Sequence, residues 1–131
     1  MEIPVELVRI IINETVDQQI VVLQERDGDR SFPIVIGMPE ILALDRRLKQ
    51  IELPRPMTHD LLANVIEELG GTVSKVVIND LRDHTFFAEL YVEVEDEVVT
   101  IDSRPSDALA LSAGLDVPLF VDEQVFEKMQ M

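Results

Sequence analysis

The short, irregularly ordered apolar segments of this 131-residue chain constrain its fold more than any other feature. Stretches typical of strands recur along the chain, and stretches with apolar residues at helical spacing come between them without a regular period. A doubly wound parallel sheet needs regular strand–helix alternation, which is missing here. The sequence therefore predicts an α+β fold, with one compact domain over residues 1–131, a mixed or antiparallel sheet and about four helices.

The element boundaries follow from apolar periodicity and from turn and capping residues. Strands are predicted over residues 5–12, 20–23, 32–36, 72–81, 86–94, 98–102 and 118–121. Helices are predicted over residues 38–51, from Thr58 to the glycine pair at 70–71, from Pro105 to Gly114, and after Asp122. Thr58 is expected to be the N-cap of its helix. The apolar stripe of that helix consists of Leu61, Leu62, Val65, Ile66 and Leu69.

Charge narrows the range of binding partners. The chain has 11 basic and 26 acidic residues, a formal charge of −15, which argues against a broad basic surface for nucleic acid. The first 60 residues are less acidic, with 7 basic and 11 acidic residues. Four cations, Arg46, Arg47, Lys49 and Arg55, fall within ten positions. They form either a solvated helix face or a local landing site for a polyanion.

Several classes of protein are excluded or disfavoured by composition. The absence of Cys excludes disulfides, thiolate zinc sites, iron–sulfur clusters and cysteine nucleophiles. No apolar run reaches the roughly 18 residues of a membrane span, and the N-terminus lacks the basic start of a signal peptide. We expect a cytoplasmic location, no membrane partner and no organic cofactor.

Two polar segments repeat one local design. Arg55–Asp60 and Arg104–Asp107 each contain Arg-Pro, then a hydroxyl residue and a carboxylate, at the start of a predicted helix. Pro fits a first helical turn, and hydroxyl and carboxylate groups satisfy its unpaired N–H groups. The simplest interpretation is therefore a pair of helix caps, with each Arg ion-paired to the nearby carboxylate. This interpretation leaves Asp102 unexplained.

The same residues also suit phosphodiester chemistry. Carboxylates hold hard divalent cations such as Mg²⁺ or Mn²⁺, guanidinium groups bind phosphate, and an imidazole can move a proton near neutral pH. The predicted catalytic residues are His59, Asp60, Asp102 and Asp107; Asp60, Asp102 and Asp107 are also the predicted metal ligands. The predicted phosphate-binding residues are Arg55, Thr58, Arg104 and Ser106.

Two further polar positions have simpler explanations. His84 lies within the segment Asp80–Thr85, whose composition is typical of a hairpin turn. Glu40 lies in the first turn of its predicted helix, where a carboxylate complements the helix dipole.

Together these motifs resemble the bifunctional nuclease domain family, and the likeness covers nearly the whole chain. It runs through the segments 33–37 with Glu40, 55–61, 80–88 and 101–108. The resemblance implies a compact α+β fold, a homo-oligomer, and activity on DNA and RNA as reported for some relatives.

Three functions stay open at this point. The first is a divalent-metal-dependent nuclease acting on DNA or RNA. The second is a non-catalytic, oligomeric regulatory or interaction module in which the Arg-Pro motifs are helix caps. The third is a protein that binds a small anion or nucleotide at the two helix starts without hydrolysing it.

Overall fold

The computed structural model describes residues 1–129, which form seven strands and four helices. The strands are β1 (Glu2–Ile11), β2 (Gln19–Glu25), β3 (Ser31–Ile36), β4 (Gly71–Arg82), β5 (Thr85–Val94), β6 (Glu97–Ser103) and β7 (Leu119–Asp122). The helices are α1 (Met38–Leu48), α2 (Thr58–Glu68), α3 (Pro105–Ser112) and α4 (Glu123–Met129).

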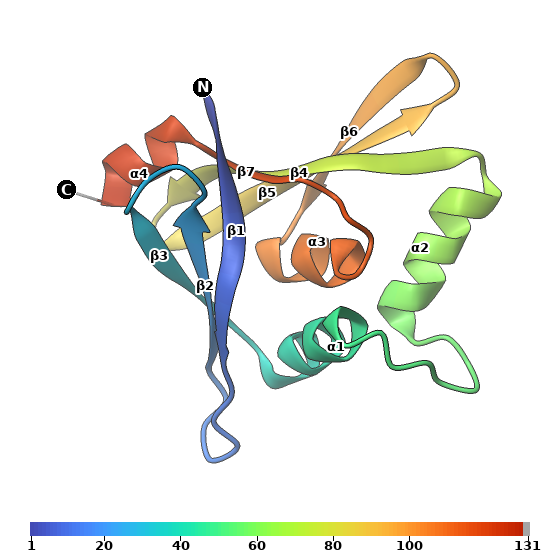
Figure 1. Ribbon diagram of the computed structural model, residues 1–131, viewed down its shortest axis with the longest axis horizontal. Coiled ribbons are helices and arrows are strands. Elements are labelled where there is room, and N and C mark those ends of the chain that lie inside the picture. Colours follow the sequence, from blue (N-terminus) through green and yellow to red (C-terminus); the bar gives the residue numbers. More distant parts are fainter. Residues whose placement is uncertain (130–131) are drawn as a thin grey trace.

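All seven strands belong to one mixed sheet in the order β3-β2-β1-β7-β4-β5-β6 (Figure 1). Two antiparallel meanders, β1–β3 and β4–β6, are joined through β7. The short strand β7 runs antiparallel to β1 and parallel to β4, which makes the sheet mixed. The predicted α+β class and mixed sheet are therefore confirmed.

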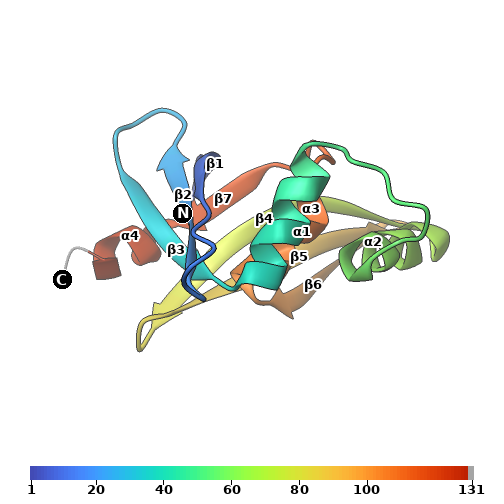
Figure 2. The same cartoon turned by 90° about the horizontal axis from the view of Figure 1, so that it is seen from below.

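The helix α3 is the centre of the helical layer, and α1 and α2 both pack against it (Figures 1 and 2). It lies on β4 and β5 and buries residues on nearly every side, because its sequence is apolar around most of its circumference. The starts of α1, α2 and α3 are thereby held within one small region.

The sheet is strongly curled. Phe32 of β3 stacks on Phe86 of β5 with ring centroids 5.3 Å apart, although four strands separate β3 from β5 in the sheet order. The ring of Phe126 in α4 packs edge-on against Phe32 at 5.4 Å. The aromatic cluster therefore brings the open edge of β3 close to the first residues of β5.

Three details differ from the sequence-based expectations. The helix predicted over 38–51 ends at Leu48, and Lys49 is its C-cap. The N-cap of α2 is Met57, whose N–H donates to Asp60 Oδ2 at 3.0 Å, so the capping role predicted for Thr58 is wrong. The apolar stripe of α2 is largely uncovered; its exposed side chains are Leu61, Leu62, Val65 and Leu69.

No helix within residues 1–129 is both long enough and apolar enough to cross a membrane.

Candidate functional site at three helix starts

A chain of polar contacts connects the first turns of α1, α2 and α3. His59 Nε2 of α2 lies 3.0 Å from Asp107 Oδ1 of α3, and Arg104 Nε donates to Asp107 Oδ2 at 2.9 Å. Arg104 Nη2 also lies 3.6 Å from Glu40 Oε1 of α1. The structure thus joins residues 40, 59, 104 and 107, although 67 positions separate the first from the last.

The local sequence around α3 explains how Arg104 and Asp107 meet. Arg104 is the N-cap, Pro105 is the first helical residue, and Asp107 lies in the first turn. A guanidinium at the N-cap and a carboxylate three residues later lie on the same side of the turn, and the carboxylate also complements the helix dipole. The predicted Arg–carboxylate pair is therefore present in this motif.

Asp107 is ionised in this arrangement. Burial opposes its ionisation, but the hydrogen bonds from Arg104 and His59 outweigh burial and lower the pKa of the Asp107 carboxyl group below its ordinary value. A carboxylate only accepts hydrogen bonds, so Nε2 of His59 carries the proton in this contact. In the neutral imidazole, the other ring nitrogen, Nδ1, carries no proton and can accept one.

Exposure differs along the contact chain. The side chain of His59 is 14% exposed and that of Asp107 is 34% exposed, whereas Arg104 is 66% exposed. The imidazole is therefore fixed within the protein, and the guanidinium extends into solvent. An arrangement of a fixed proton acceptor beside an accessible cation can position a phosphate and activate a water molecule.

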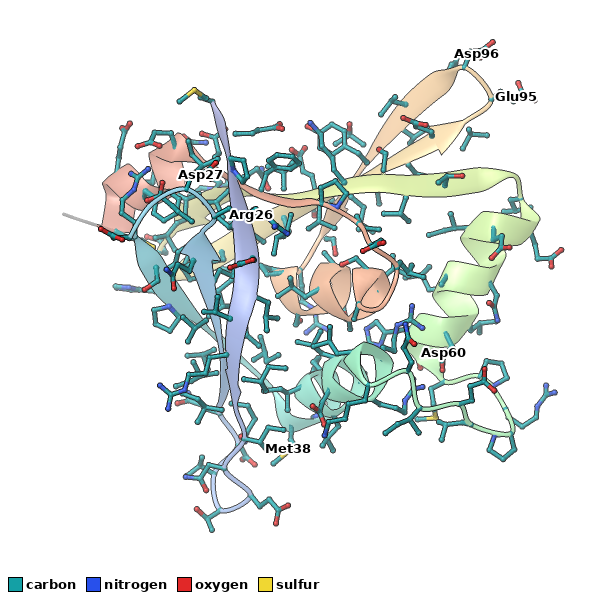
Figure 3. The ribbon with its side chains drawn as sticks, viewed as in Figure 1. Arg26, Asp27, Met38, Asp60, Glu95 and Asp96 are labelled. Carbon is teal, nitrogen blue, oxygen red and sulfur yellow. The ribbon has the colours of Figure 1, made fainter. Side chains whose placement is uncertain are left out.

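Asp60 belongs to a separate structural cluster. Its carboxylate accepts hydrogen bonds from Arg46 Nη2 at 2.8 Å and from Arg47 Nη1. Figure 3 shows Asp60 at the start of α2, on the side facing α1. Burial raises the pKa of Asp60, but the Met57 N–H and the two guanidinium groups lower it more, and the net pKa is below its ordinary value.

The Asp60 cluster accounts for half of the basic cluster seen in the sequence. Arg46 and Arg47 are 17% and 11% exposed, so they are not open landing points for a polyanion. The predicted Arg–carboxylate pair of the first motif is also wrong, because Asp60 pairs with these two residues of α1 and not with Arg55.

Asp102 lies apart from the contact chain. It is an exposed residue of β6, directly opposite Glu89 of β5, and its side chain forms no ion pair or hydrogen bond with any residue in the range 1–129. Within that range, no group of three or more His, Asp or Glu side chains could hold a metal ion. Asp60, Asp102 and Asp107 therefore do not come together as the predicted set of three ligands.

Two cavities border the helix starts. One of about 610 Å³ lies beside α1 and α2 and includes Arg55 and Asp60 in its lining. The other, of about 370 Å³, is bordered by β3, the β4–β5 turn and the start of α3. Its polar lining residues are Glu40, His84, Thr85, Arg104 and Ser106. Of the predicted phosphate-binding residues, Arg104 and Ser106 thus share a cavity, whereas Arg55 borders the other one.

Comparison with known proteins assigns the chain to a family. The profile of the bifunctional nuclease domain matches residues 21–131. An uncharacterized protein from Mycobacterium tuberculosis is 37% identical over 121 residues, covering 92% of this chain and 72% of that protein. The chain belongs to the bifunctional nuclease domain family. The recognised domain includes all three helix starts.

Plant members of the bifunctional nuclease domain family are named as nucleases. Bifunctional nuclease 2 from Oryza sativa is 31% identical over 115 residues, covering 84% of this chain and 35% of that protein. Bifunctional nuclease 1 from the same species is 25% identical over 118 residues, covering 87% of this chain and 36% of that protein. This chain therefore spans about a third of each plant nuclease.

Sequence reasoning placed His59, Arg104 and Asp107 at one site, and the structure brings these three bifunctional nuclease domain residues together. Sequence reasoning did not place His84 near Arg104, with which it borders one cavity, because His84 lies in a turn 20 positions or more from each motif. The signal that could have suggested this is the Asp83-His84 pair. A two-residue hairpin turn usually has glycine at its second central position, where this chain has His84.

Proposed function

We propose that the protein is a nuclease that hydrolyses phosphodiester bonds of DNA or RNA at the His59–Asp107–Arg104 site. The observation that carries the proposal is the 3.0 Å contact between His59 and the ionised Asp107, beside an accessible guanidinium. Membership of the bifunctional nuclease domain family and the names of its plant members support the choice of reaction.

Each residue of the site has one task in the proposed reaction. Arg104 binds a non-bridging oxygen of the phosphate, and Asp107 holds both Arg104 and His59 in place. His59 Nδ1 takes a proton from water as the water oxygen bonds to phosphorus. The bond from phosphorus to the leaving oxygen then breaks, and that oxygen takes a proton from solvent.

Dependence on a divalent cation is part of the proposal, but the described carboxylates do not fit a resident ion. Asp60 is held by two arginines, Asp107 is held by Arg104 and His59, and Asp102 is exposed on another element. We therefore assign the Mg²⁺ or Mn²⁺ requirement to ions that accompany the polynucleotide and reduce its repulsion from a chain of charge −15.

Cleavage of labelled DNA and RNA strands by purified protein tests the proposal. Asp107→Asn keeps the shape of the side chain but removes the charge that fixes His59, and we expect a loss of about 100-fold or more in cleavage rate. Lys49→Ala removes an exposed ion pair of α1 and is the matched control, with an unchanged rate. Equal cleavage rates for the parent and Asp107→Asn would contradict the assignment of the active site to His59, Asp107 and Arg104.

A second candidate function is a non-catalytic, self-associating interaction module. The exposed stripe of α2 favours it, with Leu61 54%, Val65 45% and Leu69 76% exposed. Gly71, just after α2, pairs with Val94, which pairs in turn with Glu97 of the edge strand β6. The C-terminal end of the stripe thus lies two strands from the unpaired edge of β6, and a second copy of this chain can complete such an edge through its own β6.

Solution size separates the two candidates. If the stripe joins two copies, Leu61→Gln with Leu69→Gln shifts the protein to a monomer in light scattering, while Asn64→Gln on the polar side of α2 does not. A parent chain that is monomeric at high concentration would contradict self-association. If a variant loses nuclease activity but keeps the size of the parent, disrupted self-association is not the cause of the loss.

A further inference from the structure

The cavity between β3, the β4–β5 turn and the start of α3 has the size and lining of a nucleotide site. Its volume of about 370 Å³ lies at the lower end of the range of small-molecule pockets, roughly 300–1,000 Å³. Its apolar lining residues include Pro33, Val35 and Phe86, and its polar lining residues come from α1, α3 and the turn. A ligand with a flat apolar part and a charged part matches this mixed lining.

The polar part of the lining is built around the first turn of α3. Ser106 is 7% exposed, borders the cavity, and its hydroxyl group forms no hydrogen bond with any residue between Met1 and Met129. The first N–H groups of a helix have no partner within the helix, and they favour an anion. Arg104 borders the same cavity and adds an accessible positive charge. Ser106 is thus buried as a residue, whereas its unpaired hydroxyl group is open to the cavity and available to a ligand group at this turn.

The mixed lining of the cavity favours a nucleotide over a bare anion. Inorganic phosphate matches only the polar lining residues, whereas a nucleotide also offers a flat base to the apolar residues of β3 and to Phe86. The Oε2 atom of Glu40 is buried against Gly37 and does not face the cavity, so it takes no part in this choice.

His84 is presented to the cavity at a cost in backbone strain. Its φ angle is 64° and that of Asp83 is 50°, the left-handed region that glycine adopts most easily. A glycine at position 84 would relax this turn. Similar angles occur in other turns of the chain, such as 57° at Glu95, so it is the position of His84 beside the cavity and the start of α3 that connects it with the site.

We propose that this cavity binds one nucleotide unit of a single strand. The phosphate lies at Ser106, Arg104 and His84, and the base packs on Pro33, Val35 and Phe86. The cavity admits one nucleotide but not a base pair, so single strands and frayed ends are the preferred form of substrate. The choice of ligand rests on the proposed nuclease function, but the inference is tested by binding alone.

The two histidines of the chain allow a direct test by NMR. The full-length protein is titrated with a nucleoside 5′-monophosphate, and in parallel with inorganic phosphate, in the absence of divalent cations. We expect the imidazole signals of His84 to shift with the nucleotide, at lower concentrations than with phosphate. Nucleotide that leaves the His84 signals in place would overturn the proposal.

Two variants examine the assigned contacts. Ser106→Ala removes one hydrogen bond and should weaken nucleotide binding about 3- to 10-fold. His84→Gly should weaken binding while the melting temperature stays the same or rises, because the turn is relaxed. Unchanged affinity in both variants would show that the nucleotide binds elsewhere. An unstable Ser106→Ala would leave His84→Gly to decide.

A third variant separates this inference from the proposed function. His59→Gln removes the proposed proton acceptor but can still donate to Asp107, and residue 59 lies outside the cavity lining, so this variant should abolish cleavage and leave nucleotide affinity unchanged. Binding by a parent chain that cleaves nothing would contradict the nuclease proposal and support the site. Cleavage by a parent chain that prefers duplex over single strands would contradict the site and leave the nuclease proposal standing.

Discussion

Arg47 connects three helices through a single guanidinium group. Its Nε donates to the carbonyl oxygen of Ala110 at 2.7 Å, and its Nη2 donates to that of Leu111 at 2.8 Å. These carbonyls lie in the last turn of α3, where they have no partner within the helix. Its Nη1 donates to Asp60 at the start of α2. One side chain of α1 therefore fixes the end of α3 and the start of α2.

Replacement of Arg47 by Met should lower the free energy of unfolding by about 2–4 kcal/mol, because it leaves Asp60 and two helix carbonyls with fewer partners. Chemical denaturation measures this change. Lys49→Ala is the control on the same helix, because its pair with Asp45 is exposed and should cost less than about 0.5 kcal/mol. Losses of equal size in the two variants would contradict the role assigned to Arg47.

Asp60 makes the stability of the protein depend on pH in the acidic range. Its pKa is lowered in the folded state, so it stabilises the fold above the ordinary carboxyl pKa of about 3.9, and this contribution is lost as the pH falls through the lower folded value. Asp60→Asn should be less stable than the parent at pH 7. The difference should shrink below about pH 4, as followed by thermal unfolding across pH. A difference that does not vary with pH would contradict the assigned ion pairs.

The positions of the strands and helices were more predictable than the contacts between them. The strands and helices follow from periodicity, and Gly70, with φ of 86°, ends α2 where the sequence predicts. The pairing of Asp60 with α1 could not be predicted, because it depends on how three helices pack. The exposure of the α2 stripe could not be predicted either, since periodicity gives the apolar side of a helix but not what covers it.

The strand pair β5–β6 gives a test of Asp102 at the level of elements. Asp102 lies directly opposite Glu89, and like charges in that position destabilise a sheet. Asp102→Asn should therefore raise the free energy of unfolding by about 0.2–1 kcal/mol and leave the cleavage rate unchanged. Glu93→Gln, on the same strand β5 but opposite Val98, is the control. Loss of cleavage in Asp102→Asn would return Asp102 to the catalytic site.

For the molecule as a whole, the distribution of charge sets the direction from which a polyanion can approach. Glu95 and Asp96 lie at the tip of the β5–β6 hairpin, far from the helix starts in Figure 3. The first 60 residues, which include β1–β3 and α1, carry a net charge of −4, against −11 for the rest of the chain. A polynucleotide is therefore repelled least where β3 and α1 meet the start of α3, beside the accessible Arg104.

Removal of divalent cations should weaken substrate binding more than it slows the chemical step. In the presence of a chelator we expect KM to rise several-fold, with a smaller change in kcat, because the ions screen a chain of charge −15 from its substrate. Steady-state kinetics on a single-stranded substrate measures both constants. A collapse of kcat at unchanged KM would instead indicate a resident catalytic ion.

The most direct measurement of the central claim compares the cleavage rate and the melting temperature of His59→Gln with those of the parent. Glutamine can still donate a hydrogen bond to Asp107, but it cannot accept a proton as imidazole does. If the joined helix starts form a catalytic site, cleavage falls by about 100-fold or more while the melting temperature stays within a few degrees. A His59→Gln variant that cleaves as fast as the parent, or that loses cleavage only because it unfolds, would contradict the claim that the helix starts form a catalytic site.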